Sequence, residues 1–406
     1  MMLPRLRDFP SILRRSTSGS TFLPVVDGLR FLAILPVVLQ HLSERAIRIS
    51  EARHLATPLD YAFLHALPTG RLGVELFFVI SGLIISHPFI RAHFQQTGMP
   101  KLKAFYSRRV TRLEPPYFLV MLGCYLFVRL TGYIPEGTLA FARSHVSPER
   151  SLAASLAYMH GLLIGTMPML NPPAWSLEIE IQFYILAPLV LLALFRLGGR
   201  IAILAALLLL MLGTIVGSHV LEYRLGSSHA FLVTKFLHLF ATGMFVNVLS
   251  FSGLVPQNIS RRLWDIGFAA SASVLYVIDK HGGSMLAAGL QSICYVLLFL
   301  AASNGGMFRK FLSRPWIFAT GGMCYTIYLI HLPILHVLTG IAMRTTGLVS
   351  FLPGLVLSMV TLLPILFVAS VLFYLLIEKP CMNPKWPVYL WQRTTELIRA
   401  ARVDGR

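Results

Sequence analysis

Charged side chains are scarce in this sequence. Only 13% of its 406 residues are Asp, Glu, Lys or Arg, and 56% are hydrophobic, whereas an ordinary soluble domain has about 25% charged residues. The shortage of charge excludes a soluble globular protein, and the high hydrophobicity excludes a disordered chain. We therefore predict a membrane protein whose main surroundings are the lipid bilayer.

Acidic residues and cysteines are also few. The chain has 17 Asp and Glu against 35 Lys and Arg, a formal net charge of +18. In a membrane protein this excess belongs in cytoplasmic loops and beside anionic headgroups, so no nucleic-acid partner is predicted. Four scattered cysteines give neither a disulfide framework nor a metal-ligand spacing. Phosphate-loop and dinucleotide fingerprints are missing as well, and we predict no metal.

Long apolar runs make up most of the chain. Since a span needs roughly 20 mostly apolar residues, we predict an all-α polytopic membrane protein, a bundle of about ten transmembrane helices. The weakly apolar segment 151–166 runs into several prolines and is interpreted as re-entrant or interfacial. The predicted spans are 24–43, 72–91, 114–131, 177–195, 201–218, 231–250, 264–279, 286–303, 317–340 and 351–377.

The distribution of basic residues predicts the orientation. If 151–166 does not cross, the Arg- and Lys-rich loops, such as 92–113 and 304–316, all lie on one side. By the positive-inside rule that side is cytoplasmic, and both termini lie there. The predicted organisation is a basic cytoplasmic N-terminal tail (1–20), one transmembrane domain (21–380) and a cytoplasmic C-terminal tail (381–406).

The first span contains two ionisable residues, Arg30 and His41, in the segment DGLRFLAILPVVLQH. Such residues cost at least about 2.5–3.5 kcal/mol within a span, so each is a candidate for function. Arg30 lies near the cytoplasmic end, where it can also snorkel to headgroups. His41 follows Pro36, which frees the carbonyl of Leu32 and predicts a kink toward a cavity. A packing role for His41 is the alternative.

The fourth span opens with PPAWSLEIEIQFYILAP. Glu178 and Glu180 are two residues apart, so they point to different sides of a helix. Either can serve as a first-turn acid, but Glu180 and Tyr184 share a face. Together with Trp175 and Ser176, they are candidates for a polar site.

Five ionisable residues fall at similar depth when the directions of the spans are followed. Arg71 and Glu75 stand four apart at the start of the second span, which also allows a simple ion pair. Glu180 starts the fourth span, and His331 lies past the middle of the ninth. With His41, all five are placed in the outer half, and we predict that they share one polar site.

The segment KAFYSRRVTRLEPPYF is the most basic part of the chain next to a span. Arg109 and Arg112 are three residues apart and would lie on one face of a helix, with Arg108 beside them. Such guanidinium groups can grip one phosphate group. Plain topogenic charge is the alternative interpretation.

Taken together and in order, six segments resemble the acyltransferase-3 family of integral membrane acyltransferases. The resemblance implies a ten-helix bundle in the bacterial cytoplasmic (inner) membrane. It also implies transfer of an acyl group, commonly acetyl, from cytoplasmic acyl-CoA to a hydroxyl of a cell-envelope saccharide or glycosylated metabolite. The segments are DGLRFLAILPVVLQH, GVELFFVISG, FYSRRVTRLEPPY, PPAWSLEIEIQFYILAP, YTIYLIHLPIL and IEKP.

The family's functional positions carry over one by one. Arg30 and His41 match its Arg-x10-His motif, Glu180 matches the acid of its W-S-L-x-x-E motif, and His331 matches a late-helix histidine. There are two departures. Glu75 stands where Asp is more usual, and the acid before the two prolines at 115–116 occupies a place expected to be neutral or basic.

O-acylation needs a base that removes a proton from an alcohol, and a histidine oriented by a carboxylate can do this near neutral pH. We predict His41 as the base and Glu180 or Glu75 as its partner, while an acyl-histidine intermediate stays open. A proton-coupled transporter with the same buried residues and a lipid-binding scaffold are the alternatives. The acceptor, the acyl length and the oligomeric state are left undetermined.

Overall fold

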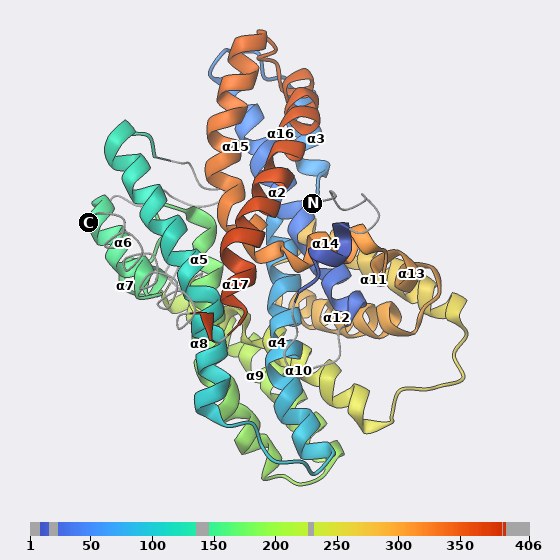
Figure 1. The fold of residues 1–406 in the computed structure, drawn as a ribbon. Coiled ribbons are helices and arrows are strands. Elements are labelled where there is room, and N and C mark those ends of the chain that lie inside the picture. Colours follow the sequence, from blue (N-terminus) through green and yellow to red (C-terminus); the bar gives the residue numbers. More distant parts are fainter. Residues whose placement is uncertain (1–8, 16–22, 135–145, 226–230, 384, 387–406) are drawn as a thin grey trace, which may run out of the picture.

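The computed structural model describes residues 9–15, 23–134, 146–225, 231–383 and 385–386. Within these ranges every regular element is helical (Figure 1), which confirms the predicted all-α fold. Most of the predicted tails, 1–20 and 381–406, lies outside the described residues. The short helix α1 (Phe9–Ile12) is the described part of the N-terminal tail.

The part of the chain with described coordinates has nine helical segments long and apolar enough to cross a membrane. The tenth predicted span, 264–279, forms α11 (Arg261–His281), whose ends are charged. The nine segments contain α2 (Pro24–Glu51), α4 (Gly70–Phe94), α5 (Leu102–Thr131), α8 (Trp175–Phe195), α9 (Arg200–Leu225), α10 (Val233–Ser252), α12 (Met285–Asn304), α15 (Cys324–Thr346) and α16 (Phe351–Phe373).

The predicted span 317–340 is divided in two. The helix α14 (Pro315–Gly322) ends before Met323, and α15 begins at Cys324. Gly321 packs on the first turn of α2, where an added Cβ would lie 1.7 Å from the carbonyl oxygen of Asp27. The division therefore accompanies a contact between helices that hydropathy alone does not register.

The basic segment and the span after it are one helix. The prediction began the span at 114, but α5 begins at Leu102 and continues through Pro115 and Pro116. Because a proline leaves a carbonyl four residues earlier without its helical donor, the carbonyl of Thr111 is free, and it accepts a hydrogen bond from Trp386 Nε1 at 2.9 Å. The arginines of this segment therefore stand on the same helix as the span that follows them.

The segment 151–166 forms two short helices, α6 (Pro148–Leu156) and α7 (His160–Ile164). Nine residues of helix rise about 13.5 Å, less than half of a hydrocarbon core about 30 Å thick. Tyr117 of α5 donates to the Ser155 carbonyl at 2.9 Å, and Glu178 of α8 accepts from the Gly161 backbone at 2.8 Å. These contacts attach the segment to the side of the bundle, and its short helices agree with the interpretation that it is not a span.

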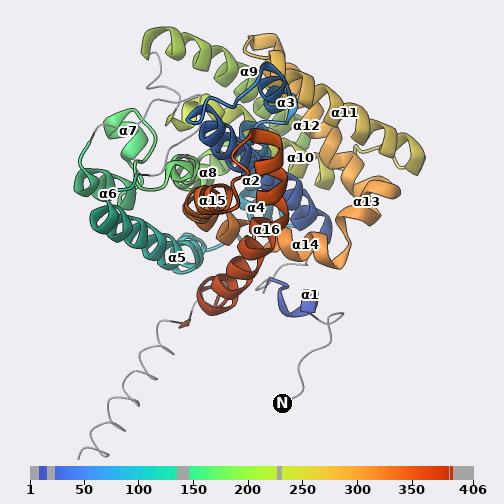
Figure 2. The same cartoon turned by 90° about the horizontal axis from the view of Figure 1, so that it is seen from above.

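The centre of the bundle is formed by α2 and α4, with α8, α10, α15 and α16 around them (Figure 2). Two glycines let α4 and α10 approach closely. A Cβ at Gly82 would lie 2.1 Å from the carbonyl oxygen of Phe240, and one at Gly243 would lie 2.0 Å from that of Val79. Small residues at such crossings are the usual means of close packing in membranes.

We expect Gly243→Ala to destabilise the bundle, because the methyl group meets backbone atoms that cannot move aside. Overpacking of this kind costs about 1–3 kcal/mol. The matched control is Gly213→Ala in α9, where an added Cβ meets open space. Thermal unfolding of the two purified variants in detergent should show a lower Tm only for Gly243→Ala; equal Tm values would mean that the crossing is not tightly packed.

Candidate functional site

A cavity of about 400 Å³ opens beside the second half of α2, and we call it the histidine pocket. Its lining comes from α2, the end of α3 (Pro58–Ala66) and the loop after it, the start of α4, the loop before α8 and the first residue of α8, α10, the end of α11 and α15. The polar and aromatic side chains in it include Gln40, His41, Glu44, Arg71, Trp175, Lys235, Phe236, Asp279 and Tyr328.

His41 is the buried imidazole of this pocket, with 6% of its surface exposed. Its Nδ1 lies 3.9 Å from Oε2 of Glu44, and Gln40 Nε2 donates to Oε1 of the same carboxylate at 2.8 Å. Since Nδ1 is enclosed and makes no hydrogen bond among the described residues, Nε2 is the nitrogen left to meet a substrate. Glu44 is the carboxylate within ion-pair distance of this ring, although 3.9 Å is too long for a hydrogen bond.

A second histidine packs against the first. The rings of His41 and His331 have centroids 5.2 Å apart. Nδ1 of His331 lies 2.8 Å from the carbonyl oxygen of Tyr328 and 3.1 Å from that of Ile327, so this nitrogen is the donor. Its Nε2 is then a lone-pair acceptor, and it is buried without a hydrogen-bond partner in the described structure. The two rings form a compact pair able to accept a proton.

Five arginines line a separate cavity of about 280 Å³, the arginine pocket. It lies beside the first half of α2, and its lining comes from the segment after α1, from α2, α4, α5, α8 and α15, and from Met382 near the end of the described residues. The polar side chains in it include Arg15, Arg30, Ser81, Arg108, Arg109, Arg112, Ser176, Glu180, Tyr184 and Tyr328.

Only part of this positive charge is balanced by carboxylates. Asp27 lies 2.6 Å from Arg30 and 3.8 Å from Arg15. Arg112 is bound at 3.1 Å to Glu378, which is fully buried. No carboxylate pairs with Arg108 or Arg109 among the residues the structure describes. The pocket therefore has net positive charge and suits a phosphate-bearing ligand.

Arg109 is fixed by contacts other than ion pairs. Its guanidinium lies 3.6 Å from the centre of the Phe105 ring and donates to the Phe105 carbonyl at 3.0 Å. The Tyr184 ring is 5.6 Å away. Stacking on an aromatic ring leaves the remaining N–H groups available for an anion.

Glu180 belongs to the arginine pocket. Ser81 donates to its Oε1, and so does Tyr184 at 2.5 Å. Glu178, by contrast, caps the backbone of α7 and faces neither pocket. Of the two acids in the WSLEIE segment, Glu180 is thus the one placed at a cavity.

The two pockets meet at Tyr328, which lines both. Its hydroxyl lies 2.6 Å from Ser176 Oγ and donates to the Pro173 carbonyl at 2.7 Å. Pro173 belongs to a 3₁₀ turn, η1 (Pro172–Ala174), ahead of α8. The preceding Asn171 donates to the Leu329 carbonyl at 3.0 Å and holds the turn against α15. Trp175 faces the histidine pocket and Ser176 the arginine pocket.

The structure divides the predicted outer site. His41 and Arg71 line the histidine pocket, and His331 packs behind His41. Glu180 lies in the arginine pocket, because the turn before α8 already enters the bundle and places this residue deeper than a helix start at the surface would. No contact joins Glu180 or Glu75 to His41 within the described ranges, so the geometry favours Glu44 as the partner of the histidine.

Glu75 makes a different set of contacts. Arg71 Nε donates to it at 2.8 Å and Gln291 Nε2 at 2.5 Å, beside a third cavity. The acid Glu114 accepts from the Tyr158 hydroxyl at 3.1 Å and does not line the arginine pocket. Its departure from the expected pattern therefore does not weaken the anion site.

Several site residues were missed by the sequence reasoning. Glu44 is three residues after His41, and Asp27 is three residues before Arg30, so helical spacing could have found both. Arg15, Tyr328 and Glu378 are distant in sequence from the residues they join. Tyr328 and Glu378 stand in the segments YTIYLIHLPIL and IEKP, but neither segment indicates which residues they contact.

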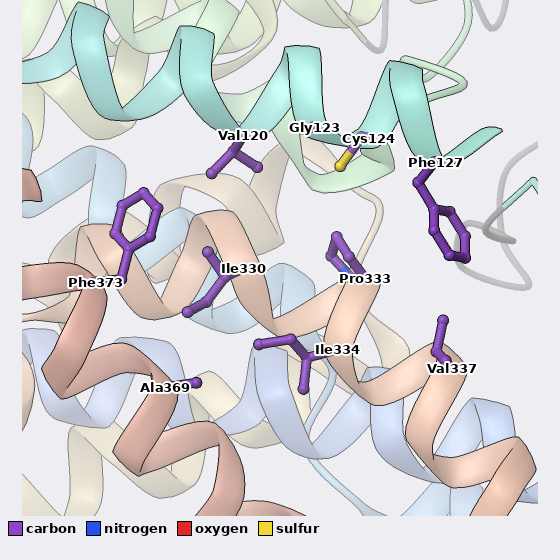
Figure 3. A pocket seen from close by; sticks show the side chains of 10 residues that line it. All are labelled: Val120, Gly123, Cys124, Phe127, Ile330, Pro333, Ile334, Val337, Ala369 and Phe373. Carbon is purple, nitrogen blue, oxygen red and sulfur yellow. The ribbon is translucent and has the colours of Figure 1, made fainter. Parts of the chain in front are cut away.

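Two further observations concern the rest of the described residues. No group of three or more His, Cys, Asp or Glu side chains that could hold a metal occurs among the described residues. An additional cavity of about 380 Å³ between α5, α15 and α16 is lined by apolar side chains and Cys124 (Figure 3). It offers no charged group or hydrogen-bonding network, so the two polar pockets are the candidates for catalysis.

Most of this chain is similar in sequence to known proteins. Residues 23–379 match the acyltransferase-3 family model, described as an acyltransferase domain. Relatives include the O-acetyltransferase OatA of Staphylococcus aureus strains NCTC 8325 / PS 47 and COL, each 26% identical over 333 residues. These matches cover 77% of this chain and 51% of the relative. The chain thus spans about half the length of these relatives, and no solved structure matches it.

Proposed function

Since this chain belongs to the acyltransferase-3 family, we propose that it is a membrane-bound O-acyltransferase that uses acyl-CoA. The acyl group, acetyl in the simplest case, passes to a hydroxyl of a saccharide or glycosylated acceptor. The observation that carries this proposal is the meeting of an arginine-lined and a histidine-lined pocket at one side chain, Tyr328.

The arginine pocket is the donor site in this proposal. Arg108 and Arg109 bind phosphate groups of CoA through charge-assisted hydrogen bonds, while Arg30 is held in place by Asp27. The thiol-bearing arm of CoA then extends along α2 toward Tyr328. Arg30 and His41 are eleven residues apart on that helix, about 16 Å, a separation that an extended arm can bridge.

The histidine pocket is the acceptor site and the place of reaction. His41 Nε2 takes the proton of the acceptor hydroxyl while the oxygen attacks the thioester carbonyl carbon. The tetrahedral intermediate collapses, the carbon–sulfur bond breaks, and the CoA thiolate recovers the proton from the imidazolium. Glu44, with Oε2 3.9 Å from Nδ1, stabilises the imidazolium by its negative charge. In this direct transfer, acyl-CoA and the acceptor alcohol give the ester and CoA, and no further reactant is needed.

His331 and Glu180 have supporting roles in this scheme. His331 packs against the His41 ring and offers its Nε2 lone pair as a second proton acceptor. Glu180 fixes the hydroxyls of Ser81 and Tyr184 in the donor pocket. In this proposal the nine apolar segments lie in a lipid bilayer.

Sidedness follows from the same arrangement. The arginine pocket lies at the end of α2 where Leu312 of α13 (Met307–Leu312) packs on Gly28, and we place that end in the cytoplasm by the positive-inside rule. A single cysteine at exposed Lys310 should resist an impermeant thiol reagent in intact cells, while one at exposed Arg53 should react. Reaction at 310 from outside would contradict this orientation.

The proposed function is tested by the release of CoA thiol from acetyl-CoA by the purified full-length protein. Slow release with water as acceptor, faster release on addition of a saccharide fraction from the cell envelope, and ester-bound acetate in that fraction are expected. The His41→Ala protein is the control for chemistry at the pocket. Proton movement across vesicles with no release of CoA would instead favour a proton-coupled transporter.

A further inference from the structure

A third cavity, of about 140 Å³, adjoins the histidine pocket, and we call it the polar chamber. The two cavities share four lining residues, Arg71, Lys235, Phe236 and Asp279. The chamber's other lining side chains include Glu75, Ser218, His219, Glu222, His238 and Gln291. A cavity needs only about 10–15 Å³ to hold one water, so the chamber has room for a larger group.

The strongest sign of a ligand is His238 of α10. Its side chain is 6% exposed, it lines the chamber, and neither ring nitrogen makes a hydrogen bond of good geometry among the described residues. The Gln291 side chain and the Lys235 backbone lie close enough to interact with the ring, but not in the alignment of a hydrogen bond. A buried polar group without a partner costs about 1–3 kcal/mol. A ligand that forms a hydrogen bond with this imidazole would remove that cost, which indicates that the chamber binds one.

The neighbouring carboxamide is already oriented. Glu75 accepts from Gln291 Nε2 at 2.5 Å and from Arg71 Nε at 2.8 Å. These contacts fix the Gln291 side chain, 6% exposed, at the edge of the chamber. Glu75, singled out by the sequence but without contact to His41, thus organises the wall of the chamber.

The charges of the lining disfavour an anion. Two cations, Arg71 and Lys235, face three carboxylates, Glu75, Glu222 and Asp279. Arg71 is paired with Glu75, and Lys235 lies 2.9 Å from Glu222. The third carboxylate, Asp279, lies 3.5 Å from Lys280 and accepts from the Thr69 backbone at 3.0 Å. With its charges paired in this way, the chamber suits an uncharged ligand that carries hydroxyl groups, in contrast to the arginine pocket.

We propose that the polar chamber binds an uncharged sugar ring of the acceptor, next to the ring whose hydroxyl is acylated in the histidine pocket. The proposal rests on the proposed function and gives the acceptor a minimum form, two adjoining rings with no charge on the second. His238 and Gln291 supply hydrogen bonds to the hydroxyls, and Phe236, which lines both cavities, supplies an apolar face between them.

The test measures occupancy of the chamber without any turnover. Ser284, exposed at the start of α12, lines the chamber and is changed to cysteine; the four native cysteines are all buried. The full-length Ser284→Cys protein is alkylated by N-ethylmaleimide, and the rate is measured. The measurement is repeated with cellobiose, maltose or N,N′-diacetylchitobiose added, and separately with inorganic phosphate added. At least one disaccharide is expected to slow alkylation several-fold, and phosphate is expected to have no effect.

The role of His238 is tested in the Ser284→Cys protein. His238→Leu should abolish protection by the disaccharide, whereas Thr242→Val, one turn further along α10 and outside the chamber, should retain it. No protection by any of the three disaccharides, equal protection by phosphate, or full protection in the His238→Leu protein would each overturn the proposal. Because alkylation needs no acetyl-CoA, these outcomes are distinguishable from a failure of the acyltransferase assignment, which the release of CoA reports.

Discussion

Replacing His41 by Ala is expected to lower kcat 10²–10⁴-fold, the range usual for loss of a general base, while the KM for acetyl-CoA stays within about twofold. The reason is geometric. His41 lies in the histidine pocket, and the arginines that hold the donor lie in the other one. The measurement is CoA release by the purified variant with saturating acetyl-CoA, with thermal unfolding to verify the fold.

The matched control for this variant is His87→Ala. His87 is a histidine of α4 that contacts Asn247 at 3.2 Å and lines neither polar pocket. Its loss should affect stability more than turnover. Wild-type turnover by a correctly folded His41→Ala protein would remove His41 from the mechanism and move the assignment to His331.

We expect Arg109 and Arg112 of α5 to differ in their effects, the first on donor binding and the second on stability. Removal of Arg109 eliminates hydrogen bonds to a charged group worth about 1.5–3 kcal/mol, so Arg109→Ala should raise the donor KM about ten- to hundredfold. The KM for the acceptor should change little. Steady-state kinetics with each substrate varied in turn measures the difference. Equal effects on both KM values would favour a purely topogenic role for this basic segment.

Arg112 should behave differently because it is already paired with fully buried Glu378, which also accepts from Thr326 at 2.7 Å. Arg112→Ala leaves that carboxylate without its cation, at a cost of about 3–5 kcal/mol. We expect a lower Tm and less protein in the membrane. The double variant Arg112→Met with Glu378→Leu should recover Tm, since replacing both members of a buried pair is often neutral. Failure of the double variant to recover would contradict a simple ion-pair role.

The positions of the membrane helices were predictable from the sequence because burial in lipid requires long apolar runs, and those runs are visible in hydropathy. The division of the predicted span 317–340 was not, since it accompanies the packing of Gly321 on the backbone of Asp27. The early start of α5 was missed for a related reason. Its first turns are basic, and hydropathy does not register a helix that continues out of the membrane.

Individual residues of the candidate site could be predicted from the sequence, but not which of them share a pocket. An ionisable side chain in an apolar helix is conspicuous, which singled out Arg30, His41 and Glu180. Depth along a straight span was a poor guide to neighbours, because the turn before α8 shifts Glu180 into the other pocket. Tyr328 stands in the segment YTIYLIHLPIL, but it carries no charge, so only the fold shows that it joins the two pockets.

The central claim is that the acyl group enters from the arginine pocket and reacts in the histidine pocket. It is tested most directly by sided CoA release from proteoliposomes whose orientation is established by labelling of Lys310→Cys and Arg53→Cys. Acetyl-CoA supplied only on the side of residue 310 should release CoA at the full rate, and acetyl-CoA supplied only on the side of residue 53 should release none. Equal release from both sides, or release only from the side of residue 53, would contradict the account.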